Sequence, residues 1–222
     1  MEYIYLVPVW FFGFSIAMEV VFAFVTIIVA SYALRIYKLS AQRESMLLGV
    51  SFLLIAFSYI LKAITNLVIM KEISEGIRGA NLTEINVLGS IGLYGYLFLF
   101  TAGLMTLAYM TLKTPNMRAY SLLLLLALTA LILSQNKVLA FAVLSTVLLA
   151  YISTYYIIQY SRKKNPKTLL ILASFVGLLI SGFGLFGVPA LGNKYVIGHI
   201  LELVSYLFIL ASLVLATRKK NA

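Results

Sequence analysis

Several residue types that carry chemistry in soluble enzymes are missing or scarce in this chain. Its 222 residues contain no cysteine, so disulfides, thiolate metal sites and cysteine nucleophiles are excluded. Aspartate is also absent, the seven acidic residues are all glutamate, and there is a single histidine. Charged residues make up only 11% of the chain, against about a quarter in soluble domains. This composition excludes an ordinary soluble globular protein.

Apolar residues dominate what is present. They account for 63% of the chain and gather in seven long runs that short polar segments separate. A helix needs roughly 20 such residues to cross a bilayer core, and the runs lack the alternation of barrel strands. The predicted spans cover residues 8 to 34, 45 to 70, 87 to 112, 117 to 135, 137 to 161, 167 to 188 and 195 to 217. We therefore expect an all-α integral membrane protein with one seven-helix domain over residues 1–222 and no soluble domain.

The positions of the lysines and arginines predict the orientation of the bundle. Basic residues in short loops are retained on the cytoplasmic side of a membrane. The first, third and fifth connections and the C-terminal tail hold twelve of them, whereas the other three connections hold four. We expect a multi-pass protein of the cell membrane with its N-terminus outside and its C-terminus in the cytoplasm. The apolar run of the first span is longer than a signal-peptide core, so it is expected to be retained.

The net charge of +10 has two interpretations. Basic surfaces attract nucleic acids, but most of these cations are explained by the predicted topology. A cytoplasmic rim of lysine and arginine also attracts anionic lipid headgroups, at about 1 kcal/mol for each residue. Because there is no separate basic domain, we expect the bilayer and its anionic lipids as partners, and no nucleic acid.

Four features of the sequence each imply a particular structural context. Residues 182–187 match the glycine pattern of dinucleotide-binding turns, but the pattern lies in an apolar span without a preceding strand. A retinal Schiff base on the last span is excluded because residues 195–217 contain no lysine. The triplet that begins at Asn81 matches an N-glycosylation acceptor in the longest outer loop, and its use stays open.

The fourth feature is a set of three glycines that lie three residues apart at the start of the third span, at Gly89, Gly92 and Gly95. Their spacing predicts a smooth face for close helix packing.

The most informative feature is the placement of four ionisable residues well inside the spans. Glu19 lies in the first span, Lys62 in the second, and His199 and Glu202 in the seventh. A charge at the bilayer centre costs about 2.5 to 3.5 kcal/mol on insertion scales, so such residues face the bundle interior and have partners. With the predicted orientation, all four fall in the outer half of the membrane.

Helical spacing extends these residues into stripes. The stripes are Ser15, Glu19 and Thr26; Ser58, Lys62, Thr65 and Asn66; and His199, Glu202 and Tyr206. The first helix of a closed seven-helix ring commonly contacts the second and the seventh, so we expect the stripes to converge on an outward-facing polar pocket. Glu19 and Lys62 are predicted to form an ion pair, and His199 and Glu202 a proton-sensitive pair. Tyr94 and Tyr96 are expected to line the far wall.

Other roles for these residues were weighed. Buried polar groups can simply hold helices together, although hydrogen bonds between membrane helices average only about 0.6 kcal/mol. A catalytic zinc site usually needs more than one imidazole, and the chain has one histidine. No nucleophile motif or paired histidine accompanies His199. We therefore expect no metal and no cofactor, and the sequence provides no support for an enzyme.

Three functions are compatible with this pattern. The first is a receptor-like or sensory protein that binds a small ligand or ion and passes a change in helix packing to a signalling partner. Its predicted binding residues are Glu19, Lys62, Asn66, Tyr94, His199, Glu202 and Tyr206. The alternative is a small proton-coupled secondary transporter that uses Glu19 or Glu202 as a relay. A further alternative is a membrane scaffold or subunit without its own ligand. The prolines lie at span ends or in loops, which favours the first function over one that needs hinges.

Overall fold

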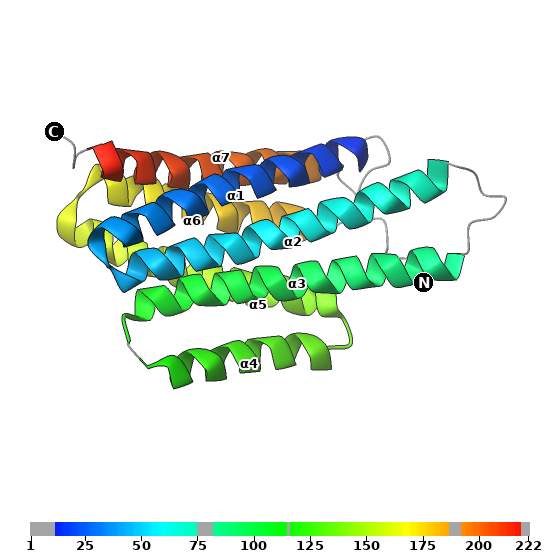
Figure 1. Cartoon of the computed structure of the whole chain (residues 1–222), viewed down its shortest axis with the longest axis horizontal. Coiled ribbons are helices and arrows are strands. Elements are labelled where there is room, and N and C mark those ends of the chain that lie inside the picture. Colours follow the sequence, from blue (N-terminus) through cyan, green and yellow to red (C-terminus); the bar gives the residue numbers. More distant parts are fainter. Residues whose placement is uncertain (1–11, 75–81, 115, 187–191, 219–222) are drawn as a thin grey trace.

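Helices make up almost all of the computed structural model, which describes residues 12–74, 82–114, 116–186 and 192–218 (Figure 1). Seven helices lie in these residues: α1 (Phe12–Ser40), α2 (Arg43–Ser74), α3 (Leu82–Leu112), α4 (Met117–Leu133), α5 (Lys137–Lys163), α6 (Pro166–Phe186) and α7 (Gly192–Arg218). The described residues contain no strand. The prediction of an all-helical fold is confirmed. Asn81 and part of the glycine pattern at 182–187 lie outside the described residues.

Each predicted span corresponds to one helix, and several helices continue beyond the apolar run. α1 ends at Ser40, six residues after the predicted end, and α2 starts before and ends after its predicted span. Long polar side chains let a helix continue past its apolar part because their charged ends reach water. α4 behaves differently and ends at Leu133, because Ser134 has an extended backbone with ψ 134°.

Side-chain and backbone caps end the helices at the short connections. The side chain of Asn116 accepts hydrogen bonds from the second and third backbone N–H groups of α4, at 3.0 and 3.4 Å. Asn136 caps α5 in the same way, accepting from the N–H of Leu139 at 3.0 Å. Lys164 follows α5 in the left-handed region with φ 44°, and Pro166 begins α6 soon afterwards. These caps explain why the polar breaks in the sequence are sharp turns.

Six of the seven helices form a closed ring, and α4 lies outside it (Figure 1). In the ring α1 packs between α2 and α7, α3 joins α2 to α5, and α6 joins α5 to α7. α4 packs along α3 and α5 and buries only Ala127 and Leu131 of its described residues. The expected ring of seven is therefore a ring of six with one helix attached. The contacts of α1 with α2 and α7 that the predicted site requires are present.

The close packing of α2 on α3 depends on glycines in α3. A Cβ atom at Gly92 would overlap the side chain of Thr65, and one at Gly95 would overlap Leu61. Further along, a Cβ at Gly103 would lie 2.6 Å from Ile55 Cγ1. The prediction of a smooth helix face is confirmed at Gly92 and Gly95, where side chains of α2 occupy the space that the glycines leave. A Cβ atom at Gly89 would lie 3.4 Å from Ile69 Cδ1, which is an ordinary contact.

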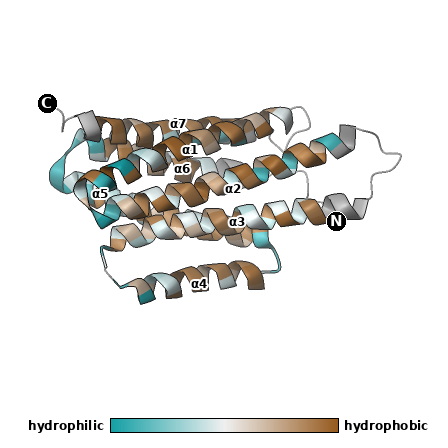
Figure 2. Cartoon of the chain, viewed as in Figure 1, coloured by the Kyte–Doolittle hydropathy of each residue, from teal (hydrophilic) through white to brown (hydrophobic). Residues whose placement is uncertain are grey.

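Helix length and surface composition are those of a helical membrane protein. Five helical stretches are long and apolar enough to cross a bilayer: Gly13–Ser40, Arg43–Lys71, Val87–Leu112, Lys137–Lys163 and Val196–Leu215. Two further apolar stretches, Met117–Leu133 and Pro166–Gly182, are shorter. Large apolar side chains such as Phe24, Phe57 and Leu133 are exposed on the outward faces, and many hydrophilic residues gather at the turns between helices (Figure 2). Such a surface matches a lipid environment rather than water.

Candidate functional site

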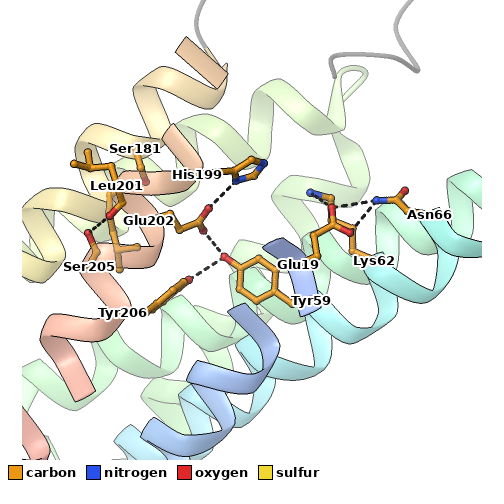
Figure 3. A network of polar contacts seen from close by, with 11 residues as sticks. Glu19, Tyr59, Lys62, Asn66, Ser181, His199, Leu201, Glu202, Ser205 and Tyr206 are labelled. Atoms are coloured by element: carbon orange, nitrogen blue, oxygen red, sulfur yellow. Dashed lines mark hydrogen bonds and ion pairs between the residues drawn. The ribbon is translucent and has the colours of Figure 1, made fainter. Parts of the chain in front are cut away.

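Glu19 of α1 is completely buried and is held by two side chains of α2 (Figure 3). Lys62 Nζ lies 3.0 Å from Glu19 Oε1. Asn66 Nδ2 donates to both carboxylate oxygens, at 3.1 and 3.0 Å. The predicted ion pair of Glu19 and Lys62 is therefore present, and Asn66 adds a second bond from the same face of α2. We call these three residues the Glu19 corner.

Lys62 also contacts α3, which ties the Glu19 corner to a third helix. Its Nζ atom lies 4.9 Å from the centroid of the Tyr96 ring. An ammonium group at this distance is attracted by the negative face of an aromatic ring. The Lys62 side chain is 25% exposed and that of Glu19 is completely buried, so the lysine is the more accessible member of the pair.

Glu202 of α7 has different neighbours, and it is 5% exposed. The hydroxyl of Tyr59 on α2 donates to Glu202 Oε1, and His199 Nδ1 lies 3.4 Å from Oε2. The hydroxyls of Tyr59 and Tyr206 are 2.9 Å apart. The predicted pair of His199 and Glu202 is present. Within the described part of the chain, no lysine or arginine pairs with Glu202. We call Tyr59, His199, Glu202 and Tyr206 the Glu202 corner.

The two corners meet at one level of the bundle, with aromatic rings between them (Figure 3). Tyr59 and Lys62 are three residues apart on α2, a rise of only about 4.5 Å along the helix axis. Phe22, one turn after Glu19 on α1, has its ring centroid 5.2 Å from that of Tyr59 and 5.6 Å from that of His199. The stripes on α1, α2 and α7 therefore converge as predicted. Together the two corners form what we call the polar cluster.

The hydroxyl groups of the predicted stripes have local partners instead. Thr26 donates to a carbonyl one turn earlier at 2.6 Å, Ser58 does so at 2.6 Å, and Thr65 at 2.9 Å. Such bonds satisfy a buried hydroxyl within its own helix. These three side chains therefore contribute to helix packing and add no free donor to the polar cluster.

The structure places Tyr94 outside the polar cluster. Its side chain is 38% exposed, and Lys137 Nζ lies 5.2 Å from its ring centroid. Tyr96 instead packs against Tyr59, with ring centroids 6.0 Å apart. Side chains two residues apart on a helix point in different directions, because each residue turns by about 100°. Tyr96 therefore belongs to the wall of the site, whereas Tyr94 lies on another face of α3.

A small cavity adjoins the Glu202 corner inside the ring. It has a volume of about 40 Å³ and is bordered by Glu202 and Tyr206 together with apolar and aromatic side chains such as Tyr96, Phe100 and Phe141. At about 30 Å³ for each water in the liquid, it has room for about one water. Its lining comes from α2, α3, α5, α6 and α7. The open volume therefore lies beside the polar cluster, towards α5 and α6, rather than between α1, α2 and α7.

Sequence reasoning missed Tyr59, which connects Glu202 to α2. The signal was available, because Tyr59 lies three residues before Lys62 and seven before Asn66 and so shares their helix face.

Among the described residues, no three histidine or glutamate side chains gather as a metal site would need. The cluster holds a fixed ion pair at Glu19, whereas Glu202 has no fixed cation beside it in the described residues. No protein-family model, no curated protein and no solved structure matches the chain.

Proposed function

We propose that this chain is a receptor-like or sensory protein that binds a small ion or ligand at the polar cluster between α1, α2 and α7. The observation that carries this proposal is Glu202, a buried carboxylate that borders a cavity and has neutral or titratable neighbours instead of a fixed cation. Ionisable residues inside membrane helices are expensive and mark ion or proton sites more often than packing sites. The proposed binding residues are Tyr59, His199, Glu202 and Tyr206 of the Glu202 corner, beside which Glu19, Lys62 and Asn66 hold α1 against α2.

Glu202 also links ligand binding to a change in helix packing. Its carboxylate joins α7 to α2 through the hydroxyl of Tyr59. A cation or proton that binds Glu202 competes with this hydrogen bond, so the bound and free states differ in the contact between α2 and α7. A ligand shifts a conformational equilibrium only through such a difference in interaction. A partner protein then responds to the altered helix positions.

Thermal unfolding in lipid nanodiscs tests the site. Sodium, potassium, ammonium and methylammonium chloride are compared at one ionic strength, with choline chloride as the filler. We expect at least one of the four cations to raise the melting temperature of the wild type and of the control Tyr151→Phe, whose ring is exposed on α5. The same cation leaves Glu202→Gln unchanged. A shift that is equal in all three proteins, or absent from the wild type, contradicts the proposal.

The proposal includes seven crossings, with the N-terminus outside and the C-terminus in the cytoplasm of the cell. It is supported by the excess of basic residues in the first, third and fifth connections, where they also meet anionic lipids. The weakest crossing is α4, which has 17 residues. Its length of about 26 Å falls slightly short of a bilayer core of about 30 Å.

Because the chain has no cysteine, single cysteines report the topology directly. Thr114→Cys and Gln135→Cys flank the two ends of α4. In intact cells, a membrane-impermeant maleimide is expected to label the cysteine at 135, and to label the one at 114 only after the membrane is opened. Labelling of both from the same side would show that α4 does not cross, and would leave six spans.

Proton-coupled transport is the second candidate, and the cavity beside Glu202 favours it. Glu202, Leu107 and Leu149 all border this cavity, so a carboxylate that exchanges a proton faces open volume inside the ring. Proteoliposomes that contain a pH-sensitive dye test this function with gradients of sodium or potassium. A change of internal pH in the wild type, but not in Glu202→Gln, supports transport. Equal traces in both proteins contradict it.

A further inference from the structure

A second cavity lies at the opposite end of the ring from the polar cluster. It has a volume of about 180 Å³ and lies where α2 and α6 begin and where α3 and α5 approach their ends. At about 30 Å³ for each water in the liquid, it has room for about six waters. Its wall includes no residue of the polar cluster. We call it the Glu44 pocket.

Most of the wall of the Glu44 pocket is polar. The polar lining residues are Glu44, Thr111, Tyr155, Tyr156, Gln159 and Thr168. Tyr156 is 8% exposed, and its ring stacks on Phe175 with centroids 5.4 Å apart and planes 11° apart. The ring of Tyr155 is nearly perpendicular to that of Tyr156, at an angle of 82°, with centroids 5.3 Å apart. The position of Tyr156 in the wall is therefore fixed by contacts with two rings.

Two of the six polar side chains in this wall have protein partners, because Thr111 donates to the carbonyl of Ala108 at 2.7 Å and Glu44 lies 3.8 Å from Lys113 Nζ. Within residues 12–74, 82–114, 116–186 and 192–218, the other four side chains form no hydrogen bond; these are Tyr155, Tyr156, Gln159 and Thr168. Ser153 lies one turn before Tyr156 on α5, and its buried hydroxyl is also without a partner in the described residues.

Of the four wall residues only Tyr156 is buried, whereas Tyr155, Gln159 and Thr168 are partly exposed. A buried polar group normally has a partner, and in the described residues the Tyr156 hydroxyl has none. The oxygens of Glu19 and Glu202, in contrast, are all engaged. The unpaired side chains of the Glu44 pocket therefore favour a ligand that supplies hydrogen bonds to them.

We propose that the Glu44 pocket binds a polyhydroxylated group, supplied either by a free sugar or polyol or by the headgroup of a glycolipid. Tyrosine and threonine hydroxyls and the Gln159 amide each donate and accept hydrogen bonds, which is what a set of ligand hydroxyls requires. The Glu44 carboxylate accepts from a hydroxyl and repels anions. It is poorly suited to a cation, because Lys113 Nζ already lies 3.8 Å from it. The side chains of Ile171 and Met110 give the C–H face of the ligand an apolar contact.

The test measures ligand-induced shifts in melting temperature in nanodiscs. One arm adds free glucose or glycerol to nanodiscs of phosphatidylcholine, and the other replaces part of the lipid with monoglucosyl diacylglycerol. Tyr156→Phe removes only a hydroxyl that has no partner in the described protein, so the unliganded protein keeps its stability. Gln159→Leu is the second variant. Tyr151→Phe, on the exposed face of the same helix, is the matched control.

We expect one arm to stabilise the wild type and the Tyr151→Phe control, with an apparent affinity at least fivefold weaker in Tyr156→Phe and weaker still in the double variant with Gln159→Leu. A shift with the free compounds identifies a soluble ligand, and a shift only with the glycolipid identifies a headgroup. The absence of a shift in both arms overturns the proposal, as does a shift that the variants leave unchanged. Both results leave the proposed function at the polar cluster untested, because no residue of that cluster is changed in these variants.

Discussion

The Glu19 corner and the Glu202 corner are one helical turn apart on α2, yet their carboxylates have different surroundings. Glu19 is neutralised by Lys62 and bonded by Asn66. Glu202 has a phenol, an imidazole and a cavity of about 40 Å³ beside it. A carboxylate with a fixed cation is already satisfied, whereas one without a fixed cation gains from a proton or an incoming cation. The comparison supports the proposal that ions act at the second corner, whereas the first corner pairs α1 with α2.

The Glu44 pocket extends this comparison to the other end of the ring. Its tyrosine and glutamine side chains make no hydrogen bonds in the described protein, whereas the carboxylate oxygens of the polar cluster are all engaged. A satisfied polar network makes the folded state specific, and the unpaired side chains support the binding site that we propose in the Glu44 pocket. The two ends of the ring therefore differ in chemistry as well as in size.

Removing the cation of the Glu19 corner is expected to have the largest effect. Lys62→Met leaves Glu19 buried without a counter-charge, which costs about 3 kcal/mol of unfolding free energy. The double variant Glu19→Gln, Lys62→Met removes both charges and is expected to recover most of this loss. Unfolding in mixed micelles measures both. A double variant as unstable as Lys62→Met would show that the pair does more than balance charge, and would break the distinction between the two corners.

The hydroxyl of Tyr59 is expected to matter less than the charge of Lys62 but more than any other neutral group of the cluster. Tyr59→Phe removes the bond to Glu202 and the contact with the Tyr206 hydroxyl. Leaving buried acceptors without a donor costs about 1 to 3 kcal/mol, so we expect about 2 kcal/mol in the same assay. The ring contacts with Phe22 and Phe100 are retained in the variant. A loss below about 0.5 kcal/mol would mean that water in the cavity replaces the phenol.

The helices and the meeting of the polar stripes could be predicted from the sequence, because both depend on local patterns. Apolar runs define membrane helices, and spacing by three and four residues puts Lys62 and Asn66 on one face of α2. The place of α4 outside the ring could not be predicted. Its run of leucines is equally apolar on every side, so the sequence does not indicate which side is buried. The buried side of α4 is determined only by its packing against α3 and α5.

The cavities could not be predicted either, since they depend on how side chains from four or five helices fill the same space. Glu44, Gln159 and Thr168 lie near the ends of their spans, where polar residues are expected without any site. Tyr59 resembles an ordinary core aromatic until Glu202 is placed beside it. Such contacts join residues 143 positions apart in the chain, and no local pattern encodes them.

Replacing the two carboxylates one at a time sharpens the comparison between the corners. Glu202→Gln keeps the shape of the side chain and strands no fixed cation, so we expect its unfolding free energy to stay within about 1 kcal/mol of the wild type. Glu19→Gln leaves Lys62 without its partner and is expected to lose more stability. The cation-induced shift in melting temperature is lost in Glu202→Gln. Equal losses of stability in the two variants would show that the corners are equivalent.

The smallest effect is expected at Tyr94, which the structure separates from the polar cluster. Tyr94→Phe keeps the ring that lies beneath Lys137 and removes a hydroxyl from a side chain that is 38% exposed. Such a substitution usually changes stability by less than about 0.5 kcal/mol, and the cation-induced shift is expected to equal that of the wild type. A loss of the shift in Tyr94→Phe, with stability unchanged, would place Tyr94 in the binding site. The site would then extend across two faces of α3, and the response to ions would no longer belong to the Glu202 corner alone.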